Sequence, residues 1–539
     1  MCAIKEHMGY FALRRPSGIM YAIALAGLVF MVGFTKIVGF DVWWHLATGW
    51  IIANMHQIPR TDIFSYTAFG SPWVNHEWLY ELLQWFIYKF GGTLALTVMK
   101  FLITAAISWL LFMTLSLVTL SRSAAIWGVV IFIWGASYRI MDRPFLLGML
   151  LLTFFCFTLH KYLRDGTKLI WSLPFLQIFW INSHGGGLLG VETVLAFALG
   201  ESIQNVSSLR LGAVAAIPAK SRSKLWIVGL LCVIGSFINP WGANIYLFYR
   251  EHAQMSTILA QTQEWLPLLH TALDGLIPPL IFIIILFLTL LSFIINARNA
   301  RISHLLLTAL TSAILFMGHR FGPEFLIVNL PILFHNMKGL VAKIPIRRPA
   351  GYTCAWVNLA LALVLSVTAL TYGIPMDIKG NIFNEVGVGA VAKFAPSRMV
   401  DFLEYYKIDG QVLNDMGLGG YLIFRRWPAK RVFIDGRTPV YGDEFYRAFV
   451  DTTRNSRNFE ELDQQYKFDY LVFAAYQAWN LRHFHKYLWE NPTWKLVYAG
   501  NDGFVYLRKD GKNRKLIKKL ELKESPIVKM MIEEESKQR

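Results

Sequence analysis

Residues 276–295 read LIPPLIFIIILFLTLLSFII and contain no charged side chain. A helix of about 20 apolar residues is long enough to cross the hydrocarbon core of a bilayer. Blocks of similar length and composition recur before and after this one, and together they predict about eleven membrane spans. The spans are expected to begin near Gly18, Leu94, Ala124, Pro144, Leu169, Gly187, Leu225, Leu276, Ser303, Gly322 and Tyr352. The chain is therefore predicted to be a polytopic α-helical membrane protein.

The composition of the whole chain agrees with this class. Of its 539 residues, 55% are apolar and only 16% are charged, and the mean hydropathy is +0.42. A soluble chain of this length would need more charge to solvate its surface. Four cysteines are too few for a disulfide scaffold, so we expect all of them to be unpaired: Cys2, Cys156, Cys232 and Cys354. No cleavable signal peptide is expected.

The basic residues predict the orientation in the membrane. If the N-terminus is cytoplasmic, Lys and Arg concentrate in the loops on its side, whereas the opposite loops hold many of the acids. With an odd number of spans, everything after about residue 371 lies on the outer, periplasmic or extracellular side. We therefore expect a multi-pass protein of the inner (plasma) membrane. The net charge of +17 reflects this topology and requires no nucleic-acid partner.

The first outer loop, residues 40–90, is rich in tryptophan and other aromatic residues. Helical spacing at 42–55 and 77–88 predicts two helices that lie in the membrane interface, where tryptophan is favoured. Ionisable groups near the hydrocarbon boundary are costly to desolvate, so their presence there favours a functional site. The loop contains five that we single out: Asp41, His45, Asp62, His76 and Glu77. The structural alternatives are hydrogen bonds between the two helices and, for Asp62, a helix cap.

Other outer loops place polar side chains on the same face. Arg143 precedes the fourth span and Arg320 lies between the ninth and the tenth. A guanidinium at the outer leaflet needs an anionic partner, which is either a lipid phosphate or a protein carboxylate. His184 belongs to the turn between the fifth and sixth spans and is a candidate substrate-binding residue, although a lone histidine in such a turn is more often a helix cap or hydrogen-bonding group.

A change of pattern near residue 375 predicts a soluble domain. Strand patterns occur at 411–413, 431–434, 470–473, 495–499 and 504–507, and helical patterns at 397–406, 418–425, 441–450, 459–466 and 483–489. This alternation predicts a small non-cytoplasmic α/β domain with a mainly parallel sheet. The predicted domains are residues 1–374 (membrane domain), 375–511 (α/β domain) and 512–539 (charged tail). Asp435 and Arg437 follow a strand, where ligands bind in such folds, but pairing with each other or docking on the membrane domain is the favoured reading.

This layout resembles the GT-C superfamily of integral-membrane glycosyltransferases, which have many spans, a large first outer loop with an acid after span one, and often a soluble C-terminal domain. The motifs DVWWHL (41–46), PRTDIFS (59–65), WVNHEWL (73–79) and NDMGLGGY (414–421) resemble more closely a largely uncharacterised bacterial GT-C-like group. The sequence also departs from the pattern: Asp41 has no adjacent acid, and Trp43-Trp44 is followed by His45 where oligosaccharyltransferases have aspartate. A metal-dependent, asparagine-directed mechanism is therefore not supported by matching residues.

The resemblance implies a glycosyltransferase whose sugar donor is carried on a polyprenyl phosphate or diphosphate in the outer leaflet. Asp41 would be the general base that activates the acceptor hydroxyl. Arg320 and Arg143 would hold the leaving phosphate. His76 and Glu77 would orient the acceptor or bind a divalent cation, and these two readings stay open. His45, one helical turn from Asp41, is placed to tune it.

Two other function classes remain in view. A transporter or flippase of lipid-linked sugars would carry ionisable residues within its spans and broken helices in two halves. A non-catalytic assembly scaffold would leave Asp41 dispensable.

Overall fold

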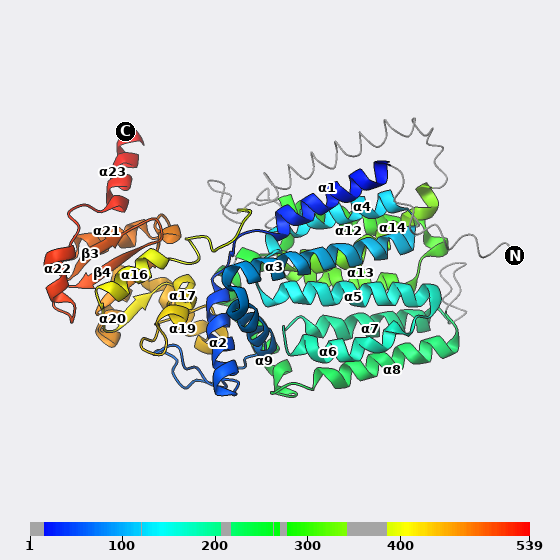
Figure 1. Cartoon of the computed structure of the whole chain (residues 1–539), viewed down its shortest axis with the longest axis horizontal. Coiled ribbons are helices and arrows are strands. Elements are labelled where there is room, and N and C mark those ends of the chain that lie inside the picture. The colour runs from blue at the N-terminus through cyan, green and yellow to red at the C-terminus, as the bar shows by residue number, and fades with distance from the viewer. Residues whose placement is uncertain are drawn as a thin grey trace. The chain divides into compact units, whose positions relative to one another are not determined.

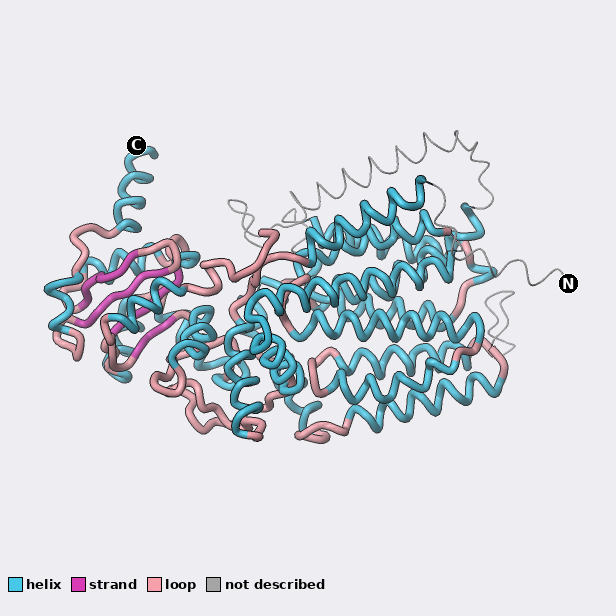
Figure 2. Tube along the Cα trace, in the orientation of Figure 1, coloured by secondary structure: helices cyan, strands magenta, loops and turns pink. Residues whose placement is uncertain are grey.

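The structure is a computed structural model that describes residues 16–119, 121–205, 217–261, 263–269, 277–341 and 385–538. Within these residues the chain is mostly helical with one small sheet (Figure 2). It divides into two compact units. Unit 1 draws its described residues from Met1–Lys36, Thr97–Gly242 and Glu264–Val388, and unit 2 from Ile37–Leu96, Ala243–Gln263 and Gly389–Arg539. We describe each unit by itself.

Unit 1 is a layered bundle of apolar helices (Figure 1). Its described α-helices are α1 (Pro16–Gly33), α4 (Arg122–Ala136), α5 (Pro144–Asp165), α6 (Leu173–Ile181), α7 (Gly187–Ile203), α8 (Ala219–Ser236), α12 (Ile277–Ile295), α13 (Ile302–Met317) and α14 (Gly322–Val341). Short 3-10 helices punctuate the loops: η2 (Ser137–Arg139), η3 (Lys168–Ser172), η6 (Ala297–Asn299) and η7 (His319–Phe321). Helix α3 (Trp78–Thr119) begins in unit 2 and ends in unit 1.

Local chemistry sets the ends of these helices. Helix α5 has Pro144 in its first turn and ends where Gly166 adopts φ +66°, a left-handed conformation that glycine accepts without strain. Helix α3 is interrupted at Gly91 and Gly92, whose backbone angles are not helical. The helical register therefore changes at this point, just before the apolar part of α3.

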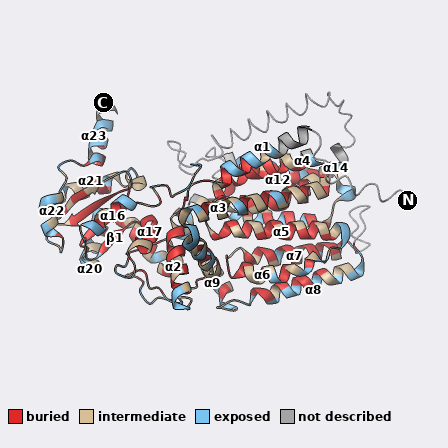
Figure 3. Ribbon diagram, viewed as in Figure 1, coloured by how far each residue is buried: buried red, intermediate tan, exposed pale blue. Residues whose placement is uncertain are grey.

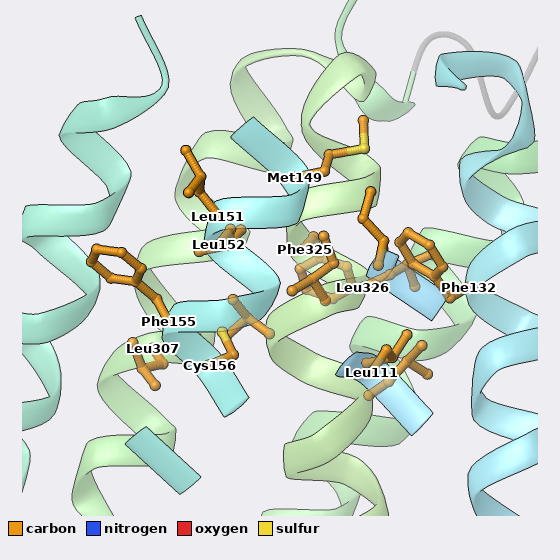
Figure 4. Close-up of a cluster of buried hydrophobic side chains, with 14 of the residues drawn as sticks. Leu111, Phe132, Met149, Leu151, Leu152, Phe155, Cys156, Leu307, Phe325 and Leu326 are labelled. Atoms are coloured by element: carbon orange, nitrogen blue, oxygen red, sulfur yellow. The ribbon is translucent and has the colours of Figure 1, made fainter. Parts of the chain in front are cut away.

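The core of unit 1 is made of large apolar side chains from different helices (Figure 4). Phe155 and Leu152 of α5, Phe132 of α4, Phe325 of α14 and Leu307 of α13 are almost completely buried. Such interdigitated side chains gain dispersion energy from many close contacts. Cys156 and Cys232 are both buried and unpaired, as predicted for them; Cys2 and Cys354 lie outside the described residues.

Helices begin within six residues of nine predicted span starts. The start predicted near Leu94 lies inside α3, just after its interruption at Gly91 and Gly92. The start predicted near Tyr352 lies outside the described residues. Two described helices are long and apolar enough to cross a membrane, Trp78–Thr119 and Pro144–Asp165. Shorter apolar helices cover Ala124–Arg139, Lys168–Ile181, Pro279–Ile295 and Ile302–Met317. The number of spans and their orientation therefore stay predictions.

Unit 2 combines the first predicted loop with the C-terminal part of the chain. Its helices are α2 (Asp41–Met55), the first part of α3, α9 (Asn244–Ala253), α10 (Ser256–Gln261), α16 (Ser397–Tyr405), α17 (Met416–Arg426), α18 (Thr438–Tyr441), α19 (Asp443–Thr452), α20 (Ser456–Tyr466), α21 (Arg482–Glu490), α22 (Arg514–Leu520) and α23 (Pro526–Gln538). The short helix η5 (Gln263–Trp265) lies at the boundary between the units. The two helices predicted in the first loop and the five predicted after residue 390 are thus confirmed. The domain boundary predicted at residues 374/375 lies outside the described residues.

The sheet of unit 2 is mixed, so the prediction of a mainly parallel sheet was wrong. Its strands are β1 (Val412–Asn414), β2 (Tyr470–Ala474), β3 (Trp494–Ala499) and β4 (Gly503–Arg508), in the order β1-β2-β4-β3. Only β1 and β2 run parallel; β4 is antiparallel to both of its neighbours. The physical reason is the short turn between β3 and β4, which permits a hairpin but no parallel crossover. All five residues of β2 are buried, and much of the sheet has the colour of buried residues in Figure 3.

The strand predicted at 431–434 does not join this sheet. Instead, Val432 donates its N–H to the carbonyl of Phe64 at 3.0 Å and accepts from the N–H of Tyr66 at 3.1 Å. The side chain of Asn414 accepts from the Phe433 N–H at 2.9 Å and donates to the Ile434 carbonyl at 2.7 Å. The backbone groups of this segment are therefore taken by the first loop and by Asn414.

Candidate functional site

Asp41 opens helix α2 in unit 2. The N–H groups of a first helical turn carry partial positive charge, so a carboxylate is stabilised there. The indole of Trp44 lies one turn further and donates to the Asp41 carboxylate at 3.3 Å. A Cβ on Gly436 would come within 2.4 Å of the same oxygen, so the backbone at Gly436 approaches the carboxylate closely. Asp41 is thus positioned by α2 on one side and by the Asp435–Arg437 segment on the other.

His45 lies on the same helix and forms a buried pair with Glu81 of α3. Its Nδ1 is 3.1 Å from Glu81, and both side chains are almost completely buried. The second Glu81 oxygen accepts from Asn75 at 2.6 Å. The other ring nitrogen, Nε2, lies 3.8 Å from Glu77. The contact with Nδ1 fixes the ring orientation, so Glu81 is placed to hold the His45 ring with Nε2 toward Glu77.

His76 and Glu77 continue this group of polar side chains. The His76 Nε2 is 3.8 Å from the Glu77 carboxylate, and its ring lies against Phe248 and Tyr249 of α9. Burial in this aromatic environment lowers the pKa of His76 to about 4, because the charged imidazolium is poorly solvated there. His76 is therefore neutral at neutral pH and can accept or donate a hydrogen bond.

Asp62 occupies a different environment, which we call the Arg437 cluster (Asp62, Asp435, Arg437 and Tyr441). The Asp62 carboxylate accepts from the backbone N–H groups of Phe64 and Ser65, both at 3.1 Å, and from Arg437 at 2.6 Å. Asp435 accepts from Arg437 at 2.7 Å, as predicted for this pair, and from the Tyr441 hydroxyl at 2.6 Å.

The same arginine is enclosed by aromatic rings. The Arg437 guanidinium carbon lies 4.5 Å from the Trp73 ring centre and 4.8 Å from that of Phe64, distances at which a cation is attracted to an aromatic face. Its side chain is 1% exposed and those of its two carboxylate partners are fully buried. The cluster ties the first loop to the 435–437 segment beside Asp41.

Glycines of helix α17 bring a third element against α2. A Cβ on Gly420 would lie 2.5 Å from the Phe40 carbonyl oxygen, and one on Gly419 would lie 2.2 Å from the Ile434 carbonyl. These glycines permit backbone-to-backbone packing that no larger residue allows without displacement. Asp415 caps the helix by accepting the Leu418 N–H at 3.0 Å. The motif at 414–421 thus holds the helix that carries Asp41 and His45.

Arg320 lies in unit 1, in what we call the Glu264 cluster (Arg139, Arg320 and Glu264). One Glu264 oxygen accepts from Arg139 of η2, and the other lies 3.3 Å from Arg320 of η7. Burial raises the pKa of Glu264, but the positive charges of Arg139, Arg320, Arg143 and His319 outweigh it and bring the pKa down to about 2. Glu264 is therefore a carboxylate at any physiological pH.

Arg143 and His184 also belong to unit 1. Arg143 precedes the first turn of α5 and is one of the cations that lower the pKa of Glu264. The His184 Nδ1 accepts from the backbone N–H of Gly186 at 3.0 Å, and its ring lies 6.5 Å from that of Phe145. This hydrogen bond within the turn accounts for His184 locally.

The candidate residues therefore fall into two groups. Unit 2 holds Asp41, His45, Asp62, His76 and Glu77, and unit 1 holds Arg143, His184 and Arg320. Sequence reasoning did not single out Asn75, Glu81, Arg139 or Glu264 as site residues. For Glu81 a signal was available, because it lies four residues after Glu77 on one helix face. Glu264 carries no such signal, since its partners lie far away in the sequence.

Several of the same side chains are of types that bind metal ions. Across the described ranges, no group of three or more His, Cys, Asp and Glu side chains is arranged to hold a metal ion. Imidazole and carboxylate groups do lie near one another around His45, His76 and Glu77, which is the ligand chemistry of several divalent cations. The divalent cation remains a prediction for that reason.

Comparison with known proteins shows that this chain resembles solved structures in its fold. No family model and no curated protein matches the sequence. Among solved structures, the oligosaccharyltransferase of Archaeoglobus fulgidus tethered to an acceptor peptide is 13% identical, covers 91% of this chain and 74% of its own, and has a TM-score of 0.50. The archaeal oligosaccharyltransferase AglB from the same organism, in complex with an inhibitory peptide and a dolichol-phosphate, is 12% identical, covers 92% and 74%, and has a TM-score of 0.51. In fold, this chain is similar to these archaeal oligosaccharyltransferases.

Proposed function

We propose that this protein is a membrane glycosyltransferase that moves a sugar from a polyprenyl-phosphate-linked donor to an acceptor on the outer face of the membrane. The likeness in fold to oligosaccharyltransferases, one of them bound to a dolichol-phosphate, supports the class of donor. The observation that carries the proposal is the setting of Asp41, a carboxylate at a helix start next to the Gly436 backbone.

In this proposal Asp41 is the general base. It takes the proton from the acceptor hydroxyl while the hydroxyl oxygen bonds to the anomeric carbon of the sugar. The bond between that carbon and the phosphate oxygen breaks, and the lipid phosphate leaves with the electron pair. Arg320 and Arg143 would stabilise the charge on the leaving phosphate.

The other candidates receive supporting roles. Glu81 fixes the His45 ring, which lies one turn from Asp41 and within 3.8 Å of Glu77. Glu77 and the neutral His76 would orient the acceptor through hydrogen bonds. For Asp62, the contacts with Arg437 and with two backbone N–H groups support a structural role. The hydrogen bond of His184 to its own turn supports the same reading.

The test is consumption of pooled polyprenyl-linked sugar donors by the purified full-length protein in detergent. The wild type, Asp41→Asn and the matched control Asp510→Asn, whose side chain is exposed, are compared at equal folded yield. Turnover should fall by about 10²- to 10⁴-fold in Asp41→Asn, as expected for loss of a general base, and persist in the control. Wild type that binds donors without consuming them would reject the transferase and leave transport or scaffolding.

A further inference from the structure

Two arginines in the Glu264 cluster share the Glu264 carboxylate, and a second acid, Glu324 of α14, interacts electrostatically with both of them. Each guanidinium has five N–H donors, whereas a carboxylate has only two oxygens to divide between them. Arg139 is 2% exposed, and its Nε has no hydrogen-bond partner among the described residues. Buried donors without partners are costly. The donors of this cluster therefore outnumber the acceptor atoms that the carboxylate provides.

An aromatic ring lies against each of the two guanidiniums. The guanidinium carbon of Arg139 lies 3.6 Å from the ring centre of Phe145, and that of Arg320 lies 4.1 Å from that of Trp265. Contact with a ring occupies the flat face of a guanidinium and leaves the N–H edge available for an anion. The N–H edges of Arg139 and Arg320 are thus both available to bind an anion.

A phosphate fits these donors better than a carboxylate does. Phosphate groups offer three or more acceptor oxygens, and arginine recognises them through paired N–H groups. The Glu264 side chain is 26% exposed, against 2% for Arg139. Glu264 is therefore the most exposed member of the cluster, since the Arg320 side chain is 17% exposed.

We infer that the Glu264 carboxylate is an internal stand-in for a phosphate, and that the Glu264 cluster binds a phosphate or diphosphate group once this side chain is displaced. The ligand is an anion of the phosphate class, either free or carried on a lipid. Its identification with the leaving phosphate of a donor rests on the proposed function. The cluster adds Arg139 to the phosphate-binding residues and makes Glu264 a competitor of the ligand.

The experiment measures binding to the full-length protein in detergent by calorimetry at fixed ionic strength, with inorganic pyrophosphate and farnesyl diphosphate as probes. Glu264→Gln should bind the diphosphate group about tenfold more tightly, because the competing charge is gone. Arg139→Gln should bind it about tenfold more weakly, both alone and combined with Glu264→Gln. The control Glu251→Gln, an exposed residue of α9, should leave affinity unchanged.

If Glu264→Gln bound either probe no more tightly than Glu251→Gln does, the inference would be overturned. Should Glu264→Gln fail to fold, Glu264→Asp provides the same test with a smaller expected gain, since its shorter carboxylate reaches both arginines less well. Farnesyl diphosphate that binds more tightly than pyrophosphate identifies a lipid-carried ligand, and equal affinities identify a free anion.

These measurements require no turnover, so the two proposals can fail separately. Sugar transfer with no gain in diphosphate affinity in Glu264→Gln rejects the displaceable carboxylate and leaves the transferase standing. A clear gain in affinity without any sugar transfer by the wild type rejects the transferase and leaves the anion site.

Discussion

The Arg437 cluster of unit 2 and the Glu264 cluster of unit 1 both combine arginines with carboxylates, but the ratio of arginines to carboxylates is reversed between them. In unit 2, one guanidinium is shared by two carboxylates, which also accept from backbone N–H groups and from Tyr441. In unit 1, two guanidiniums share the Glu264 carboxylate, and Glu324 is a second acidic neighbour of both. The first arrangement supplies both carboxylates with donors and leaves one buried donor, the Arg437 Nη1, without a hydrogen-bond partner among the described residues, so it favours a fixed structure. In the second, the N–H donors of two guanidiniums exceed the two oxygens of Glu264 by a wider margin, which favours binding of an anion.

Replacing the arginine of the Arg437 cluster should have the largest effect on stability. Arg437→Gln leaves Asp62 and Asp435 buried without their cation, which costs about 3–5 kcal/mol of unfolding free energy. Chemical denaturation in detergent measures this loss. Arg447→Gln, at a side chain that is 61% exposed, is the control and should cost less than about 0.5 kcal/mol. An Arg437 variant as stable as this control would show that the cluster is not a structural tie.

Acid should weaken the Glu264 cluster in a defined pH window. The pKa of Glu264 is about 2 when folded and 4.5 ordinarily, so its stabilisation is complete above pH 4.5 and is lost as the pH falls toward about 2. The ionised Glu264 side chain therefore contributes about 3 kcal/mol to the free energy of unfolding above this window. The difference in stability between wild type and Glu264→Gln, followed from pH 6 to pH 2, checks it. A difference independent of pH would contradict the depressed pKa.

Unit 2 should respond to acid at higher pH through His76. Its pKa falls from 6.5 to about 4 on folding, so between these values the unfolded chain binds a proton that the folded chain does not. Stability is thus lost as the pH falls from about 6.5 to about 4, by about 2 kcal/mol after allowance for partial exposure. Comparison with His76→Gln isolates this contribution from that of Asp415, whose pKa is raised to about 6 by burial. If wild type and His76→Gln lost stability identically as the pH falls, the assigned role of His76 would be refuted.

Removing one arginine from the Glu264 cluster should have the smallest effect. In Arg320→Gln the carboxylate keeps Arg139, so no charge is left buried without a partner, and the cost should be about 1 kcal/mol. The same denaturation assay places this variant beside Arg437→Gln. If both lost the same stability, the contrast between the two clusters would have no energetic meaning.

Helices were well predicted from local pattern, whereas pairing between distant segments was not. Apolar blocks and helical spacing act within a few residues, so their effect can be read locally. The segment 431–434 has the composition of a strand, yet its partners are residues 64–66 and Asn414. Strand pairing is decided by which edge is free in three dimensions, and composition does not contain that information.

The candidate site shows the same difference between local features and contacts of distant residues. The sequence by itself determined that Asp41 and His45 share one face of a helix, because their spacing is one turn. It also determined that ionisable residues gather in the loops between apolar blocks. Only the tertiary structure decided that Asp62 meets Arg437, 375 positions later, and that Arg139 and Arg320 share Glu264. Charges act through space, so the partners of a buried ion depend on the folded path of the chain.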